Sequence, residues 1–232
     1  SDNWIDNDSS KIGVSGGVMS LDVYRDNTND STAYDLTSVA GTDWTLRFKY
    51  ESTGLGTNYA GNGYYVGLSD SDQASGARAS QDFVGVALYQ DNTSSYRAMD
   101  SDGVMMPELW LGDDSQTTTY SVGNIFYFEI IKSGTSYSVE QFTGSDYSTG
   151  SAGKITGSTT ASGLQYIKIT NGDAGYNIPT STNPFTSDIS EMKFYDGVTS
   201  VLPASVLDKS ANSVAVNSNL ITGYATSAVF TE

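Results

Sequence analysis

The stretch Ile125-Phe-Tyr-Phe-Glu-Ile-Ile-Lys-Ser-Gly-Thr-Ser-Tyr-Ser-Val-Glu-Gln-Phe142 decides the fold. Its first half is β-branched and aromatic, as strands prefer, and an alternating apolar pattern resumes after a polar break that contains one glycine. Gly134-Thr135 suits a two-residue type II′ turn, which takes glycine at its first central position. The stretch therefore predicts a β-hairpin.

The turn also sets the register of this hairpin. Ile130 is expected opposite Val139, and Glu129 is expected opposite Glu140. Because alternate residues of a strand share one face, three apolar side chains should point together into a core. These are Phe126, Phe128 and Ile130.

A second clear strand covers residues 43–51. Its two faces differ in polarity, with Trp44, Leu46, Phe48 and Tyr50 on one and Thr45, Arg47, Lys49 and Glu51 on the other. A period of two with opposite polarity predicts one buried face and one solvated face.

Further strands are expected at 18–24, 33–36, 64–69, 83–89, 95–99, 108–111, 117–122, 164–170 and 189–195. The segment 164–170 mixes apolar and polar residues on both faces, so its buried side stays open. Asp100-Ser-Asp-Gly103 is interpreted as a turn. No stretch has a helical period. Many short strands separated by turn residues indicate an all-β sandwich or jelly roll, and 232 residues suit one such domain.

The composition excludes several classes of function. With no Cys and no His, the chain has no disulfides, no thiol chemistry, no Ser-His-Asp triad and no His-bound zinc. Its net charge of −16 argues against nucleic acid or an anionic membrane as a partner. No apolar run approaches the ~20 residues of a membrane helix, so no membrane insertion is expected. Abundant Gly, Ser, Thr, Asn, Asp and Tyr suggest a secreted or extracellular surface location.

Four stretches, in this order, resemble the concanavalin A-like lectin/glucanase superfamily and its laminin G-like domains: 44–50, 67–70, 127–137 and 189–197. The last contains the family's acidic–apolar–basic–apolar–Tyr pattern as Glu191-Met-Lys-Phe-Tyr195. The resemblance implies two antiparallel sheets in a jelly roll, and a family of sugar-binding modules, adhesion domains and some glucanases. The expected division is a jelly-roll domain at 1–197 and a β-prone C-terminal tail at 198–232.

The glucanases of this superfamily carry a Glu-x-Asp-x-(x)-Glu strand, from which this sequence departs. None of its six glutamates is followed two places on by Asp, and the legume-lectin metal loop has no counterpart. Family catalytic residues therefore cannot be carried over, and the protein is expected not to be an enzyme.

The Glu129/Glu140 pair is the one candidate for catalysis. Directly opposed residues have Cβ atoms about 4.5–5.5 Å apart, and a retaining glycosidase places its carboxyls about 5–5.5 Å apart. A calcium ion could also bridge two such carboxylates. The simpler interpretation, which we favour, is that both face solvent or that a longer turn moves them out of register.

Asp-rich turns could supply oxygen ligands to a structural Ca²⁺, and Asp100 and Asp102 are the chosen pair. The same residue types are also what tight turns require.

Trp110 lies between Leu109 and Leu111, so it is exposed if these leucines are core. Exposed Trp and Tyr stack on sugar rings, and Trp110, Tyr64 and Tyr120 are therefore the predicted ligand-binding residues. For any single one of the 16 Tyr, a structural role on the sheets is favoured.

These observations together predict a non-catalytic, carbohydrate-binding or adhesive module that binds a glycan by aromatic stacking and by Asp/Asn hydrogen bonds. Two alternatives stay open. One is a structural subunit of an extracellular filament or surface assembly, self-associating by donating the tail as a strand to its neighbour. The other is a glycoside hydrolase or lyase that uses Glu129 and Glu140. Packing of the tail on its own domain is expected over donation, because it has no concentration penalty.

Overall fold

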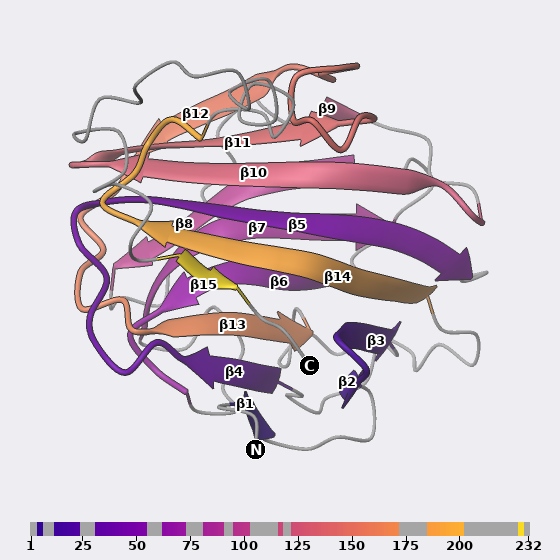
Figure 1. Cartoon of the computed structure of the whole chain (residues 1–232), viewed down its shortest axis with the longest axis horizontal. Coiled ribbons are helices and arrows are strands. Elements are labelled where there is room, and N and C mark those ends of the chain that lie inside the picture. Colours follow the sequence, from indigo (N-terminus) through magenta and orange to yellow (C-terminus); the bar gives the residue numbers. More distant parts are fainter. Residues whose placement is uncertain are drawn as a thin grey trace, which may run out of the picture.

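The strands form two antiparallel sheets that pack against each other around one core (Figure 1). The structure is a computed structural model, and it describes residues 4–6, 12–23, 31–54, 62–72, 81–90, 95–102, 116–117, 122–171, 185–201 and 227–229. Within these ranges it has fifteen strands and no helix. Consequently none of the described segments is a helix long and apolar enough to cross a membrane.

The first sheet has seven strands. In spatial order they are β1 (Trp4–Asp6), β4 (Ser31–Asp35), β13 (Tyr166–Asn171), β6 (Asn62–Ser69), β7 (Asp82–Gln90), β8 (Ser95–Asp102) and β9 (Gln116–Thr117).

The second sheet has eight strands. In order they are β12 (Lys154–Ser158), β11 (Ser136–Phe142), β10 (Ile125–Ser133), β5 (Asp43–Gly54), β14 (Phe185–Asp196), β3 (Val18–Val23) and β2 (Ile12–Ser15), with β15 (Ser227–Val229) beside β14. This is the two-sheet antiparallel jelly-roll β-sandwich that the sequence predicts, so the fold class is confirmed.

The hairpin of β10 and β11 has the predicted register. Ile130 pairs with Val139 and Glu129 pairs with Glu140. The turn is Gly134-Thr135, and only its first residue has a positive φ, of 58°, as a type II′ turn requires.

The core lies between the sheets and contains the predicted rows of β5 and β10. Trp44, Leu46, Phe48 and Tyr50 are all fully buried, as are Phe128 and Ile130, and Phe126 is 8% exposed. The rings of Phe48 and Phe128 stack with centroids 5.3 Å apart. Burying each large apolar side chain contributes about 1.5–3 kcal/mol, so these rows contribute substantially to the stability of the second sheet.

The opposite face of β5 is not solvated as predicted. Thr45 is fully buried and Arg47 is only 6% exposed. The Tyr147 ring lies 4.2 Å from the Arg47 guanidinium, and the chain after β14 crosses the same face, where Thr45 Oγ1 donates to the carbonyl of Val198. The prediction is wrong because two segments distant in the sequence cover this surface.

The segment 100–102 is also not a turn. It continues β8 to Asp102, with Asp100 paired to Val84 and Asp102 paired to Asp82. The long neighbouring strand β7 supplies ladder partners along this length, and that pairing overrides the turn preference of the Asp-Ser-Asp sequence.

Strand β14 joins the second sheet to the tail. It pairs with β3 up to Ser190, is interrupted by a bulge between Ser190 and Lys193, and then pairs with β15 from Lys193. Glu191 has a φ of 52° within this bulge. The tail strand β15 therefore lies in the second sheet of its own chain (Figure 1).

Candidate functional site

The structure decides which side of β13 is buried between the sheets. Ile167 and Ile169 belong to the main core. Because successive side chains alternate, Tyr166, Lys168 and Thr170 lie on the outer face of the first sheet, away from that core. The alternation therefore places the partly exposed Tyr166 and the buried Lys168 on the same face.

The outer face next to Lys168 carries two glycines in adjacent strands. Lys168 pairs with Gly67 of β6, which pairs with Gly85 of β7. A Cβ on Gly67 would lie 2.2 Å from the carbonyl of Val84 and 2.9 Å from the Phe83 ring. Only glycine fits there, and the ring of Phe83 packs over the resulting flat strip as part of a second apolar cluster with Tyr65 and Ala87.

Lys168 is fully buried, and its ammonium has a defined partner. The Nζ donates to Gln81 Oε1 at 2.7 Å, and Ser69 Oγ donates to the same oxygen at 3.2 Å. The Ser69 hydroxyl also accepts from the backbone N–H of Ser71 at 3.1 Å. Burial lowers the pKa of Lys168 to about 8, against an opposing effect of the Asp70 and Asp72 charges.

Four aspartates surround the end of the sheet at which Tyr166 lies; we call residues 35–37, 69–72, 81–82 and 162–166 the rim. Asp82 N donates to Asp70 Oδ1 at 2.9 Å, and Ser162 N donates to Asp82 Oδ2 at 2.7 Å. Asp35 Oδ1 accepts from Thr37 N and from Gln165 Nε2. Burial is the main cause that raises the pKa of Asp70. The carboxylates thus hold the loops of the rim together.

Tyr166 is the aromatic residue of the rim. It pairs with Asp35 in the ladder of β13 and β4 and with Ser69 in that of β13 and β6. Burial, and then the charges of Asp72 and Asp35, raise the pKa of its phenol, so it stays protonated at neutral pH. A ring flanked by carboxylate acceptors can stack on an apolar surface while its neighbours bind hydroxyl groups.

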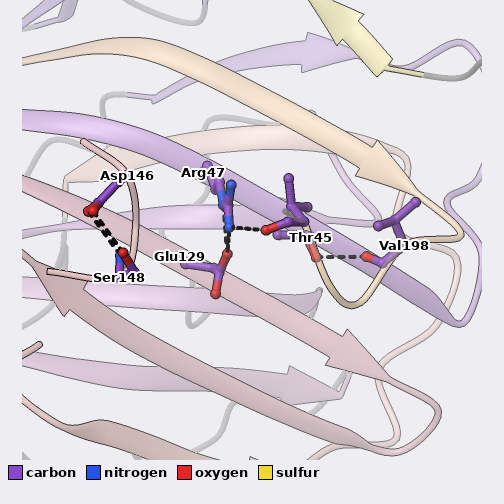
Figure 2. A network of polar contacts seen from close by, with 7 residues as sticks. Thr45, Arg47, Glu129, Asp146, Ser148 and Val198 are labelled. Carbon is purple, nitrogen blue, oxygen red and sulfur yellow. Dashed lines mark hydrogen bonds and ion pairs between the residues drawn. The ribbon is translucent and has the colours of Figure 1, made fainter. Parts of the chain in front are cut away.

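Glu129 and Glu140 are opposed as predicted, yet each has its own partner. Glu129 Oε2 accepts from Arg47 Nε at 2.6 Å, and Glu140 Oε1 accepts from Ser151 Oγ at 2.5 Å. Figure 2 shows Glu129 directed to Arg47, near the contact of Thr45 with Val198. Catalysis by the two glutamates stays a prediction, which the ion pair does not favour.

The other predicted site residues are not brought together on this rim. Tyr64 is in β6, where it pairs with Leu88, a core residue, and Asp100 and Asp102 are in β8. Trp110 and Tyr120 lie outside the described residues. Within the described part of the chain, no three acidic residues converge as a metal site would need. Since the turn proposed to hold calcium is a strand, Ca²⁺ binding stays a prediction without a located site.

Sequence analysis missed Tyr166 and Lys168, although a signal was present. In Tyr166-Ile-Lys-Ile-Thr170 the two isoleucines lie on one face of the strand, and Tyr166, Lys168 and Thr170 lie on the other. Gln81 carried no such signal, since its contact with Lys168 spans 87 positions.

No protein-family model and no curated protein matches the sequence. Solved structures do. A legume lectin-like domain from Entamoeba histolytica is 14% identical with a TM-score of 0.54, over 84% of this chain and 91% of that chain. A functionally unknown protein from Saccharomyces cerevisiae is 12% identical with a TM-score of 0.51, over 85% and 97%. An alginate lyase from Klebsiella pneumoniae is 12% identical with a TM-score of 0.46, over 84% and 87%. The chain thus shares the jelly-roll fold of this legume lectin-like domain, and the expected resemblance is confirmed for the fold.

Proposed function

We propose that this protein is a non-catalytic carbohydrate-binding module whose glycan binds at the rim of the first sheet. The observation that carries the proposal is Tyr166, a partly exposed ring flanked by the carboxylates of Asp35 and Asp72. A sugar presents an apolar C–H face that stacks on such a ring, and hydroxyl groups that donate to carboxylates. The lectin-like fold is consistent with this chemistry.

The construction of the rim supports the same proposal. Asp35, Asp70 and Asp82 each accept at least one hydrogen bond from a backbone N–H in the rim, so the loops are held in place before any ligand arrives. Binding then costs less loop-ordering entropy, which matters because single sugar contacts are weak. We further propose a secreted or cell-surface setting, in line with the composition.

The test is a glycan array followed by titration calorimetry on the best ligand. Tyr166→Ala should weaken binding about tenfold or more, which corresponds to about 1.4 kcal/mol, whereas Tyr166→Phe keeps the ring and should retain most of the affinity. Asp72→Ala should also weaken binding through the loss of an acceptor. Tyr195→Ala, on a partly exposed tyrosine of the second sheet, is the matched control and should bind as the unmodified protein does.

Two results would refute this proposal. One is the absence of binding to any glycan by a protein shown to be folded. The other is an affinity for the same glycan that is equal in the Tyr166→Ala variant and the unmodified protein. A melting temperature measured for each variant separates loss of the site from loss of the fold.

A further inference from the structure

A single buried cation lies next to the rim. Lys168 occupies the same face of β13 as Tyr166, two residues further along the strand. The described charged and titratable groups of the rim come from four strands or the turns beside them. They are Asp70 and Asp72 after β6, Asp82 at the start of β7, Asp35 at the end of β4 and Tyr166 on β13. Of these, Asp70 and Asp72 act directly on the charge of Lys168, and Asp82 acts on Asp70.

A chain of hydrogen bonds links this cation to the turn that carries two of the carboxylates. The Lys168 ammonium donates to the side-chain amide oxygen Oε1 of Gln81, which also accepts from the Ser69 hydroxyl. The Ser69 hydroxyl accepts from the N–H of Ser71, and so fixes the turn between Asp70 and Asp72. The Ser69 carbonyl in turn accepts from the N–H of Gln165, the residue before Tyr166.

We propose that Lys168 is the positioning residue of the rim, and that glycan binding requires its proton. The inference rests on the proposed function. The positive charge opposes the mutual repulsion of the rim carboxylates and keeps Asp70 and Asp72 at a fixed distance from Tyr166. A neutral amine still donates a hydrogen bond to Gln81, but it no longer offsets the carboxylate charges, so the turn moves away from the ring.

As the pH rises through the pKa of Lys168, glycan affinity should then fall while the contribution of Lys168 to folding stability rises. The pKa of Lys168 is about 8 in the folded protein, below the ordinary 10.5, so the unfolded chain holds more protons between these values. Its contribution to folding stability accordingly rises with pH through this window. A merely structural lysine would leave affinity unchanged or improved there, whereas a positioning lysine makes affinity fall.

The size of the fall follows from the protonated fraction. With a pKa of about 8, about nine tenths of Lys168 is protonated at pH 7 and about one tenth at pH 9. Apparent affinity scales with the competent fraction, so the dissociation constant should rise about tenfold between these pH values. Tyr166 does not titrate in this range, because its pKa is raised.

The experiment is calorimetric titration of the best neutral glycan from the array between pH 6.5 and 9.5. The dissociation constant of the unmodified protein should rise about tenfold between pH 7 and pH 9. Lys168→Met should bind weakly at every pH with a flat profile, and Lys168→Arg, which stays charged, should bind tightly with a flat profile. Lys49→Met removes a partly exposed lysine on the second sheet, and this variant should show the same tenfold rise in the dissociation constant as the unmodified protein. Melting temperatures are recorded at each pH.

Each outcome decides something. If the dissociation constant of the unmodified protein does not change with pH, the inference is overturned without needing any variant to fold. The inference is also overturned if the tenfold rise in the dissociation constant persists in Lys168→Met. Binding to no glycan at any pH overturns the proposed function, and the inference with it. Affinity that falls while the melting temperature also falls attributes the rise in the dissociation constant to unfolding and contradicts the inference.

Discussion

Arg47 and Glu129 form an ion pair on the outer face of the second sheet. Removing only one of the two charged side chains should greatly lower the free energy of unfolding. Their side chains are only 7% and 11% exposed, and Arg47 also donates to the carbonyl of Val201 at 3.0 Å beneath the Tyr147 ring. Removing one partner leaves the other charge buried without compensation, which costs about 3–5 kcal/mol. Replacing both by apolar residues avoids that penalty and should cost no more than either single change.

A double-mutant cycle measures this difference. The variants are Arg47→Met, Glu129→Leu and the double variant, each unfolded in urea at pH 7 with the slope m checked for constancy. Each single variant should lose about 3–5 kcal/mol of unfolding free energy, and the double variant should lose no more than either single variant. The coupling energy between the two residues is then about 3 kcal/mol or more.

The adjacent Lys49–Glu51 pair is the matched control. Its charged atoms are 3.5 Å apart and its side chains are 21% and 36% exposed, so solvent screens it. The same cycle there should give a coupling below about 1 kcal/mol. If the Arg47 and Glu129 changes add within about 0.5 kcal/mol, the ion pair is not a buried unit and this account is wrong.

Three further changes test the fold and the buried lysine. Phe48→Ala should lower the free energy of unfolding by about 3–5 kcal/mol, and a loss under about 0.5 kcal/mol would contradict its place in the core. Gly85→Ala should cost about 1–3 kcal/mol, because the new Cβ meets the Val66 carbonyl at 2.3 Å, whereas Gly13→Ala has nothing within 4 Å and should be nearly neutral in thermal melts. Between pH 8 and 10.5 the unmodified protein should gain about 2–3 kcal/mol relative to Lys168→Met, since the folded-state pKa of Lys168 is about 8; a constant difference in urea titrations would show that its charge is not buried.

The fold could be predicted because its central strands carry a strong local pattern. The alternation in β5 and the turn glycine at position 134 each specify a face or a register within a few residues. Those signals need no knowledge of the rest of the chain, since the period of two is a property of the strand itself.

The remaining features depend on contacts between distant residues. Arg47 looks like a solvent-facing charge until the chain around Val201, 154 positions away, crosses over it. The Asp-Ser-Asp sequence of β8 looks like a turn until β7 pairs with it. The rim was missed for a similar reason, because Asp35, Asp72 and Tyr166 come from three separate parts of the chain. Self-association through the tail stays a prediction, and β15 pairs within its own chain.

The order of strands in the second sheet also has a consequence for synthesis. Strand β5 lies between β10 and β14, while its neighbours in sequence, β4 and β6, are both in the other sheet. About 140 residues separate the end of β5 at Gly54 from the end of β14 at Asp196. At about 5–20 residues per second, a ribosome needs between about 7 and 30 s to deliver them. Strand β10 ends at Ser133, so it is available to pair with one edge of β5 well before β14 is made. The other edge of β5 lacks its partner for the whole interval, so this edge of the nascent chain is open to pairing with other chains until β14 emerges.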